Sequence, residues 1–238
     1  MIRRNYTFID TLSKTQRIAG FIYLPFHVFV LPVLLAVAVH MIPEDISGIA
    51  INTAYFGLGI LFCLTVMMKY MRRAFDILLD NLAENIFSIL WGYLLYMVLN
   101  ILAALALILV MGGDIENPNN AEIMNLIDGS NLRIVMGIAV FLAPVVEEIL
   151  FRGVLFGSIR RKSRVLAYAV SIILFAFFHV WQYALAFNDP LLLLYALQYV
   201  PIGYALAWCY ERTSSIWIPI FLHMLINLAS MMLLGISA

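Results

Sequence analysis

Seven continuous apolar runs dominate the sequence, and each is close to the roughly 20 residues that a helix needs to cross a bilayer. They cover residues 18–42, 49–70, 86–111, 133–158, 164–187, 190–209 and 215–236. Because apolar and polar residues do not alternate within them, the pattern excludes a transmembrane β-barrel. Charged residues make up only 12% of the 238 residues, against about 25% in soluble domains, which excludes a water-soluble fold. We therefore expect an all-α fold, a polytopic transmembrane helix bundle with seven membrane spans.

Residues 72–85 differ from these runs because charged side chains interrupt them. The apolar residues Phe75, Leu78, Leu79 and Leu82 lie three or four positions apart. This spacing gives one apolar face, as in a helix that lies in the membrane interface. A plain helical connector that extends a neighbouring span fits the same pattern, so both interpretations stay open.

The distribution of basic residues predicts how the chain is oriented, since Lys and Arg resist translocation. Twelve of the 14 basic residues lie in the N-terminal segment and in the loops after the second, fourth and sixth runs. The other loops carry mainly Asp and Glu, with Arg133 at the edge of a span. We expect a multi-pass membrane protein with a cytoplasmic N-terminus and its C-terminus outside. The balance of 14 basic and 14 acidic residues gives no indication of nucleic-acid binding.

A few ionisable residues lie inside the apolar runs, where their desolvation is costly and each is a candidate for a functional site. The five that carry the argument are Glu147, Glu148, Arg152, His179 and His223. His27 and His40 lie in the first run without a carboxylate nearby in sequence, and we expect them to be packing or interface residues.

Helical spacing divides these residues into pairs. Glu148 and Arg152 are four positions apart with the acid first, the favourable order for an ion pair within a helix. Glu147 is rotated by about 100° from Glu148 on a helix of 3.6 residues per turn, so it faces another part of the bundle and could act as a general base. His223 and Asn227 are also four apart and present an imidazole and an amide along one stripe.

The depth of each polar residue in the membrane independently indicates whether residues of different spans can meet. Counting about 1.5 Å of rise per residue from the cytoplasmic ends puts Glu147, His179 and Asn227 at roughly 20–22 Å and His223 near 16 Å. Four polar side chains from three spans are therefore predicted to share one layer. Taken together they indicate a site that activates water, although each alone fits a satisfied intramembrane polar residue and Asn227 fits an interhelical hydrogen bond.

At these residues the sequence resembles the CAAX-protease and bacteriocin-processing family of intramembrane proteases, also called the Abi family. The family motifs E-E-x-x-x-R, F-x-x-x-H and H-x-x-x-N correspond to Glu147-Glu148-Ile-Leu-Phe-Arg152, Phe175-Ala-Phe-Phe-His179 and His223-Met-Leu-Ile-Asn227. All three motifs occur in the family's order on separate predicted helices. We interpret 133–238 as a catalytic four-helix core and 1–132 as three further spans with the candidate interfacial helix.

The resemblance implies hydrolysis of a peptide bond within the membrane. By analogy, Glu147 activates water, His179 holds or polarises that water, and His223 with Asn227 stabilises the oxyanion. The implied substrate is a membrane-proximal peptide or protein: a prenylated C-terminus, a bacteriocin or signal-peptide precursor, or the tail of a membrane protein. The compact chain looks more like a prokaryotic member, in the plasma membrane, and its oligomeric state does not follow from the sequence.

The resemblance leaves the use of a metal open, because the family has been described both as metalloproteases and as glutamate-dependent enzymes. Glu147, His179 and His223 could supply three zinc ligands with one open position, which would leave Glu148 as the base. No H-E-x-x-H motif places two ligands on one helix, and we favour metal-free catalysis in which Glu148 and Arg152 fix the helix and tune the charge on Glu147.

A non-enzymatic membrane protein is the competing interpretation. The Glu and His layer could relay protons in a carrier, or the chain could bind a bacteriocin-like partner as an immunity protein. A carrier usually has repeated halves with helices broken at matching positions, and the sequence shows no such symmetry. The interpretation as a protease is therefore favoured.

Overall fold

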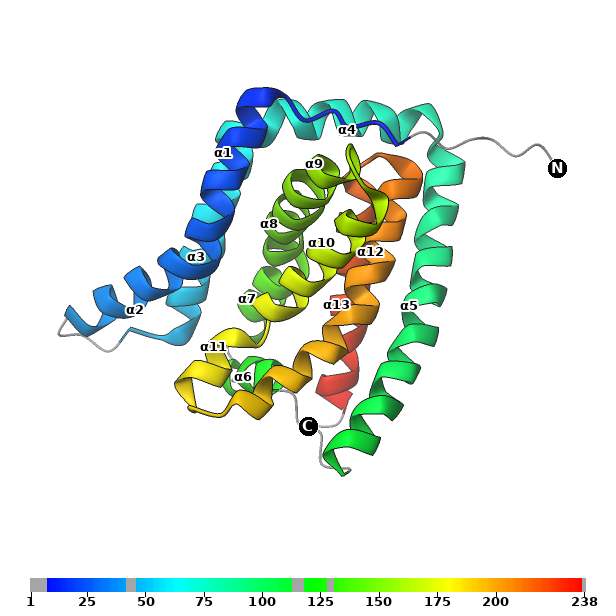
Figure 1. Cartoon of the computed structure of the whole chain (residues 1–238). Helices are drawn as coiled ribbons and strands as arrows, with labels where there is room; N and C mark the ends of the chain where they lie inside the picture. Colours follow the sequence, from blue (N-terminus) through cyan, green and yellow to red (C-terminus); the bar gives the residue numbers. More distant parts are fainter. Residues whose placement is uncertain (1–7, 42–45, 113–117, 128–130, 237–238) are drawn as a thin grey trace.

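The structure is a computed structural model that describes residues 8–41, 46–112, 118–127 and 131–236. Its regular elements in these ranges are all helices (Figure 1). Five helical rods are long and apolar enough to cross a membrane. The first rod comprises α1 Lys14–Pro25, η1 Phe26–Val30 and α2 Leu31–Met41; the second comprises α3 Gly48–Phe62, η2 Cys63–Met67 and α4 Met68–Asp80; the third is α5 Leu82–Met111.

The fourth rod, from Leu132 to Arg160, is central. It comprises α7 Leu132–Met136, η3 Gly137–Leu142, α8 Ala143–Glu148, η4 Ile149–Phe156 and α9 Gly157–Arg160. The fifth rod comprises η5 Pro190–Gln198 and α12 Tyr199–Thr213. The remaining helices are α6 Pro118–Leu126, α10 Arg164–Phe178, α11 Trp181–Ala186 and α13 Trp217–Ile236. The fourth rod contacts α1, α3, α10, α12 and α13, so the polar residues that it carries are enclosed by the bundle.

The all-α polytopic bundle expected from the sequence is confirmed. Six of the seven expected runs coincide with helices or helical rods to within a few residues, except that the second rod continues beyond its run into α4. The expected span 164–187 is wrong at its end, because α10 stops at Phe178. His179 is its C-cap, and Val180 leaves the helical conformation with φ of −130° before α11 begins. α10 and residues Trp217–Leu233 of α13 are apolar but shorter than the five long rods.

Residues 72–85 form most of α4 and the start of α5. Figure 1 shows α4 running across one end of the bundle, at a large angle to α3 and α5. Met71, Ala74 and Leu78 are buried against the bundle, whereas Phe75 and Leu79 are exposed. The exposed apolar side chains suit contact with lipid at an interface, which favours the interfacial helix over the plain connector that the sequence left equally open.

The two sides of the bundle are closed by different helices. α1 and α3 lie on one side of the inner helices and α5 on the other (Figure 1). α5 packs on α12 and α13, and Gly92 makes this possible, since a Cβ there would lie 2.4 Å from Cys209 Sγ and 2.7 Å from Leu222 Cδ2. Small residues allow such close approach between membrane helices.

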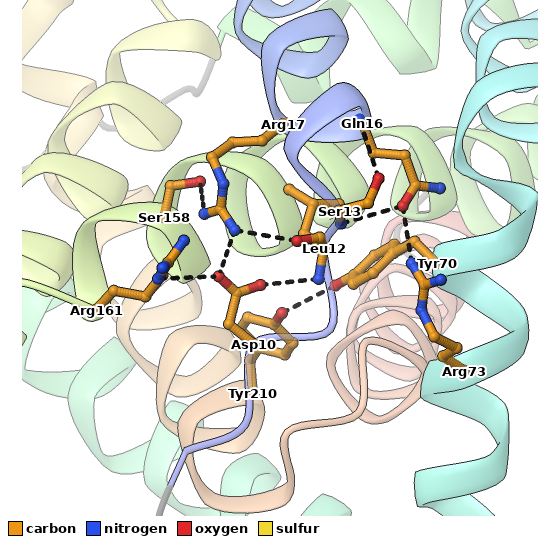
Figure 2. Close-up of polar contacts among 10 residues, drawn as sticks. All are labelled: Asp10, Leu12, Ser13, Gln16, Arg17, Tyr70, Arg73, Ser158, Arg161 and Tyr210. Carbon is orange, nitrogen blue, oxygen red and sulfur yellow. Dashed lines mark hydrogen bonds and ion pairs between the residues drawn. The ribbon is translucent and has the colours of Figure 1, made fainter.

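The segment before α1 is tied to the end of the bundle at which α4 lies. Asp10 accepts a hydrogen bond from Arg17 Nη2 at 2.8 Å and lies 4.0 Å from Arg161 Nε (Figure 2). Arg17 also donates to Ser158 Oγ at 2.8 Å, and the Ile9 N–H donates to Ser214 Oγ at 2.9 Å. These contacts join the N-terminal segment to the turns that follow α9 and α12.

A second set of contacts at the same end joins the first two rods to α12. Gln16 accepts from Arg73 Nη2 at 2.9 Å and donates through Nε2 to the Val66 carbonyl at 3.0 Å. The hydroxyl groups of Tyr70 and Tyr210 are 2.9 Å apart and buried (Figure 2). Arg17, Arg73 and Arg161, which the sequence assigned to one membrane face, thus lie at one end of the structure.

Candidate active site

Glu147 and Glu148 lie at the end of α8, and both side chains are buried within the central rod, with exposed fractions of 5% and 0%. α3 passes close to this point because Gly59 has no side chain. A Cβ on Gly59 would lie 2.7 Å from Val146 Cγ1. The close passage of α3 past the residue before Glu147 helps to hold the α8 backbone in place.

The predicted ion pair between Glu148 and Arg152 is present. Arg152 Nη1 donates to Glu148 Oε1 at 2.9 Å, and neither side chain is exposed. Arg152 Nη2 donates to the Gly203 carbonyl on α12 at 3.2 Å, and its guanidinium lies 4.1 Å from the centre of the Phe175 ring. His223 Nδ1 lies 2.9 Å from the same Oε1 of Glu148. Glu148 therefore joins the central rod to α13 as well as stabilising its own helix.

Glu147 faces both imidazoles. Its Oε2 lies 3.8 Å from His179 Nε2 and 3.9 Å from His223 Nε2. These distances are too long for direct hydrogen bonds. Glu147 Oε2 is buried and has no hydrogen-bond partner. A buried carboxylate oxygen without a partner is expected to be hydrogen-bonded by ordered water or by a ligand, so these three atoms define a position for a small polar molecule.

The hydrogen bond at Nδ1 of each imidazole determines whether Nε2, the nitrogen that faces Glu147, carries a hydrogen. His179 Nδ1 is 2.8 Å from the Phe175 carbonyl, which can only accept, so Nδ1 carries the hydrogen. His223 Nδ1 is likewise the donor toward the carboxylate of Glu148. In a neutral ring the other nitrogen is then an acceptor. Both Nε2 atoms present lone pairs toward the position beside Glu147, so a water molecule there has three acceptors around it and can donate to Glu147 and to one of the two imidazoles at a time.

Asn227 is placed by a contact between helices. Its Nδ2 donates to the Ala139 carbonyl in η3 at 2.9 Å, which is the interhelical hydrogen bond that the sequence left as the alternative reading. The residue also lines the cavity that holds Glu147, His179 and His223. Its amide therefore has a structural partner, and a contact with a bound molecule would use the remaining hydrogen of the same group.

Phe175 and Tyr199 complete the surroundings of the imidazoles. Phe175 is fully buried, with its ring centre 4.6 Å from that of His179 and 5.9 Å from that of His223. Tyr199 stacks on His179 at 4.2 Å between ring centres. The motifs include Phe175, as the first residue of F-x-x-x-H, but sequence reasoning missed Tyr199, which lies at the start of α12 and belongs to none of the three motifs.

The remaining histidines of the first rod lie outside this cluster. His27 is buried and stacks on Tyr55 with 4.3 Å between ring centres, as expected for a packing residue. His40 lines the wider cavity.

The cluster lies in a cavity of about 820 Å³, within the range of ligand sites. The cavity is lined by residues of α2, α3, α5, α6, α8, α10, α11, α12 and α13 among others. Its lining includes Glu122 of α6 and Tyr183 of α11, whose hydroxyl donates to the Glu122 carboxylate. Burial and the adjacent Glu122 raise the pKa of Tyr183 above its usual range, so Tyr183 remains a donor. The cavity thus extends from the cluster to α6 and α11, which lie at one end of the bundle in Figure 1.

Two imidazole nitrogens and a carboxylate oxygen are donor types that zinc binds. Among the residues that the structure describes, no group of three His, Cys, Asp or Glu side chains is arranged to hold a metal ion. If a zinc ion were bound, Glu147, His179 and His223 would be its ligands, and the metal-free route stays a prediction.

Two comparisons with known proteins agree with the motifs. Residues 129–229 match the family model described as Type II CAAX prenyl endopeptidase Rce1-like. Over 191 residues the chain is 27% identical to the protein named "Putative membrane peptidase YdiL" of Bacillus subtilis (strain 168). The aligned region covers 78% of this chain and 73% of that protein. No solved structure matches the chain. The resemblance drawn from the three motifs is confirmed.

Proposed function

Because residues 129–229 match the Rce1-like CAAX endopeptidases, we propose that the chain is an intramembrane endopeptidase in which Glu147 activates a water molecule. The observation that carries this proposal is the buried, unpartnered Oε2 of Glu147, with His179 Nε2 at 3.8 Å and His223 Nε2 at 3.9 Å. A general base must lie within reach of the proton that it abstracts, directly or through one water. One water molecule at this position would contact all three groups.

The charges of the site favour transfer of a proton to Glu147. Two carboxylates, Glu147 and Glu148, share one guanidinium, Arg152, in a buried environment. Uptake of a proton from water by Glu147 leaves Glu148 and Arg152 as a balanced pair and moves the uncompensated negative charge from Glu147 to the attacking oxygen, and from there to the carbonyl oxygen of the substrate. The hydroxide equivalent formed in this way attacks the carbonyl carbon of the substrate, and the proton passes on to the leaving amine.

His179 and His223 have different partners and therefore different roles. His179 donates to a neutral carbonyl and would hold the attacking water through the lone pair on Nε2. His223 donates to the Glu148 carboxylate, which stabilises a positive charge on the ring. In its charged form His223 would present an Nε2–H to the developing oxyanion, with Asn227 as a second donor. Each preorganised donor of this kind contributes about 3–4 kcal/mol to transition-state stabilisation in well-studied enzymes.

The test is cleavage of membrane-anchored peptides by purified protein in lipid nanodiscs, followed by mass spectrometry. We expect Glu147→Gln and His179→Ala each to lower the rate by about 10²–10⁴, the usual contribution of a general base. Asp80→Asn, which removes an exposed carboxylate on α4, is the matched control and should leave the rate unchanged. Thermal unfolding of each variant shows that it is folded. Unchanged cleavage in Glu147→Gln would remove that residue from the mechanism.

Two further measurements separate the alternatives that the sequence left open. Incubation with a chelator, with metal analysis of the same sample, should leave the rate unchanged if the side chains act alone. Loss of activity that zinc restores would contradict the metal-free route. In liposomes, proton flux that depends on Glu147 without peptide cleavage would favour a carrier over a protease.

A further inference from the structure

The cavity that reaches Glu147 has an uneven distribution of charge. Among the described residues that line it are two carboxylates, Glu122 and Glu147, and neither Lys nor Arg. The nearest guanidinium to the catalytic cluster, that of Arg152, is fully buried behind Phe175 and bound to Glu148 and Gly203. A negatively charged group that entered the cavity would meet two carboxylates and neither Lys nor Arg, so that among the described lining residues only imidazoles could supply a positive charge.

The described residues near α6 and α11 carry mainly negative charge. They include Glu122 of α6 and Asp189 before η5, with Arg133 of α7 as the basic residue. α6 and α11, which lie at one end of the bundle in Figure 1, supply Glu122 and Tyr183 to the lining. Clefts lined by one sign of charge raise the local concentration of ligands of the opposite sign.

The rest of the lining suits a peptide chain with apolar side chains. Four apolar residues of α2 line the cavity: Pro32, Leu35, Ala36 and Val39. The last three follow Pro32 by three, four and seven positions, the spacing of one apolar helix face. Six carboxamide side chains from six different helices also line the cavity: Asn52, Asn100, Asn119, Gln182, Gln198 and Asn227. Carboxamides both donate and accept, as the two faces of an extended peptide backbone require.

We propose that the substrate is an internal, cationic segment of an amphipathic peptide, read by Glu122 through a basic side chain, rather than a tail held by its terminal carboxylate. This proposal rests on the proposed function and specifies its substrate class. A free terminal carboxylate is usually bound by Arg, Lys or a set of backbone N–H groups, and no Arg or Lys side chain is present in the described lining. The apolar face of α2 would receive the hydrophobic part of the segment.

The experiment uses three internally quenched peptides that share one apolar sequence and carry Lys, Gln or Glu at the same flanking positions. Each is made with a free and with an amidated C-terminus, and kcat/KM is measured for the full chain in nanodiscs. We expect Lys to be preferred over Glu, and amidation to change kcat/KM by less than about twofold. Glu122→Gln should lower the preference for Lys by about fivefold, the upper range for a solvent-exposed ion pair, and Glu122→Lys should invert it. The matched variant Asp80→Asn should keep the wild-type preference.

Binding of the same peptides to the Glu147→Gln variant distinguishes failure of this inference from failure of the proposed function. Preferential binding of the Lys peptide without hydrolysis by the wild-type protein would overturn the peptidase activity and leave the inference standing. Hydrolysis of all three peptides at equal rates, or hydrolysis that requires the free carboxylate, would overturn the inference and leave the peptidase standing. Absence of both binding and hydrolysis would overturn both.

Discussion

Glu148 connects more of the site than its neighbour Glu147 does. One of its oxygens accepts from Arg152 and lies within hydrogen-bond distance of His223 Nδ1, from a helix 75 positions away in sequence. The spacing of four residues predicted the pairing with Arg152. The contact with His223 could not be predicted in the same way, because it depends on the rotation of α13 about its own axis, which no local pattern records.

Arg152→Met tests the strength of this buried pair. The substitution leaves Glu148 buried without its cation, and breaking a buried pair by removing one partner costs about 3–5 kcal/mol. Unfolding of the reconstituted protein, followed by denaturant titration, should show a loss of this size. Arg164→Met is the matched control, since Arg164 pairs with Glu211 with 64% of its side chain exposed; it should cost less than about 1 kcal/mol. Equal losses in the two variants would contradict the account of the pair.

At the scale of elements, apolar length predicted the positions of the helices well but not where α10 ends. Most residues from Val180 to Phe187 are still apolar, so the apolar run continues through the break that the backbone makes at Val180. That break places His179 at the last turn of α10, where its Nδ1 meets the Phe175 carbonyl. Stacking on Tyr199 likewise depends on how α12 crosses α10, which is a matter of packing between helices.

Contact between α5 and the inner helices gives a prediction at this scale. Gly92→Ala should destabilise the protein by about 1–3 kcal/mol, the usual effect of overpacking, because the new methyl group would overlap Cys209 and Leu222. Gly57→Ala on α3 is the matched control, since nothing lies within 4 Å of its added Cβ. It should stabilise its helix by up to about 1 kcal/mol. The two variants are compared by thermal unfolding, and a change of the same sign in both would argue against the close contact at Gly92.

For the whole molecule, the sequence predicted that four polar residues from three spans share one layer. In the structure, His179 Nε2 and His223 Nε2 each lie within 4 Å of Glu147 Oε2. The extent of the cavity was not predictable. Its walls include α2, α3 and α5 from the part of the chain without motifs, whose apolar patterns do not distinguish a face toward lipid from a face toward a cavity.

Orientation in the membrane is a prediction for the whole molecule, and among the described residues Arg17, Arg73 and Arg161 lie at the end where α4 lies. We expect Asp80→Cys, on α4, to be protected from a membrane-impermeant maleimide in intact cells and labelled after lysis. Asn125→Cys, on α6, should be labelled in intact cells. The native Cys63 and Cys209 are buried and without a disulfide, so the unsubstituted chain provides the background. The reverse pattern of labelling would overturn the orientation drawn from the loops.

The most direct test of the central claim is a double-mutant cycle on peptide cleavage with Glu147→Gln, His179→Ala and both together. If the two side chains act on one water molecule, their effects are not independent. We predict that the double variant is no slower than the slower single variant, within about threefold. Multiplication of the two single losses in the double variant would show that Glu147 and His179 act separately, and would contradict the account.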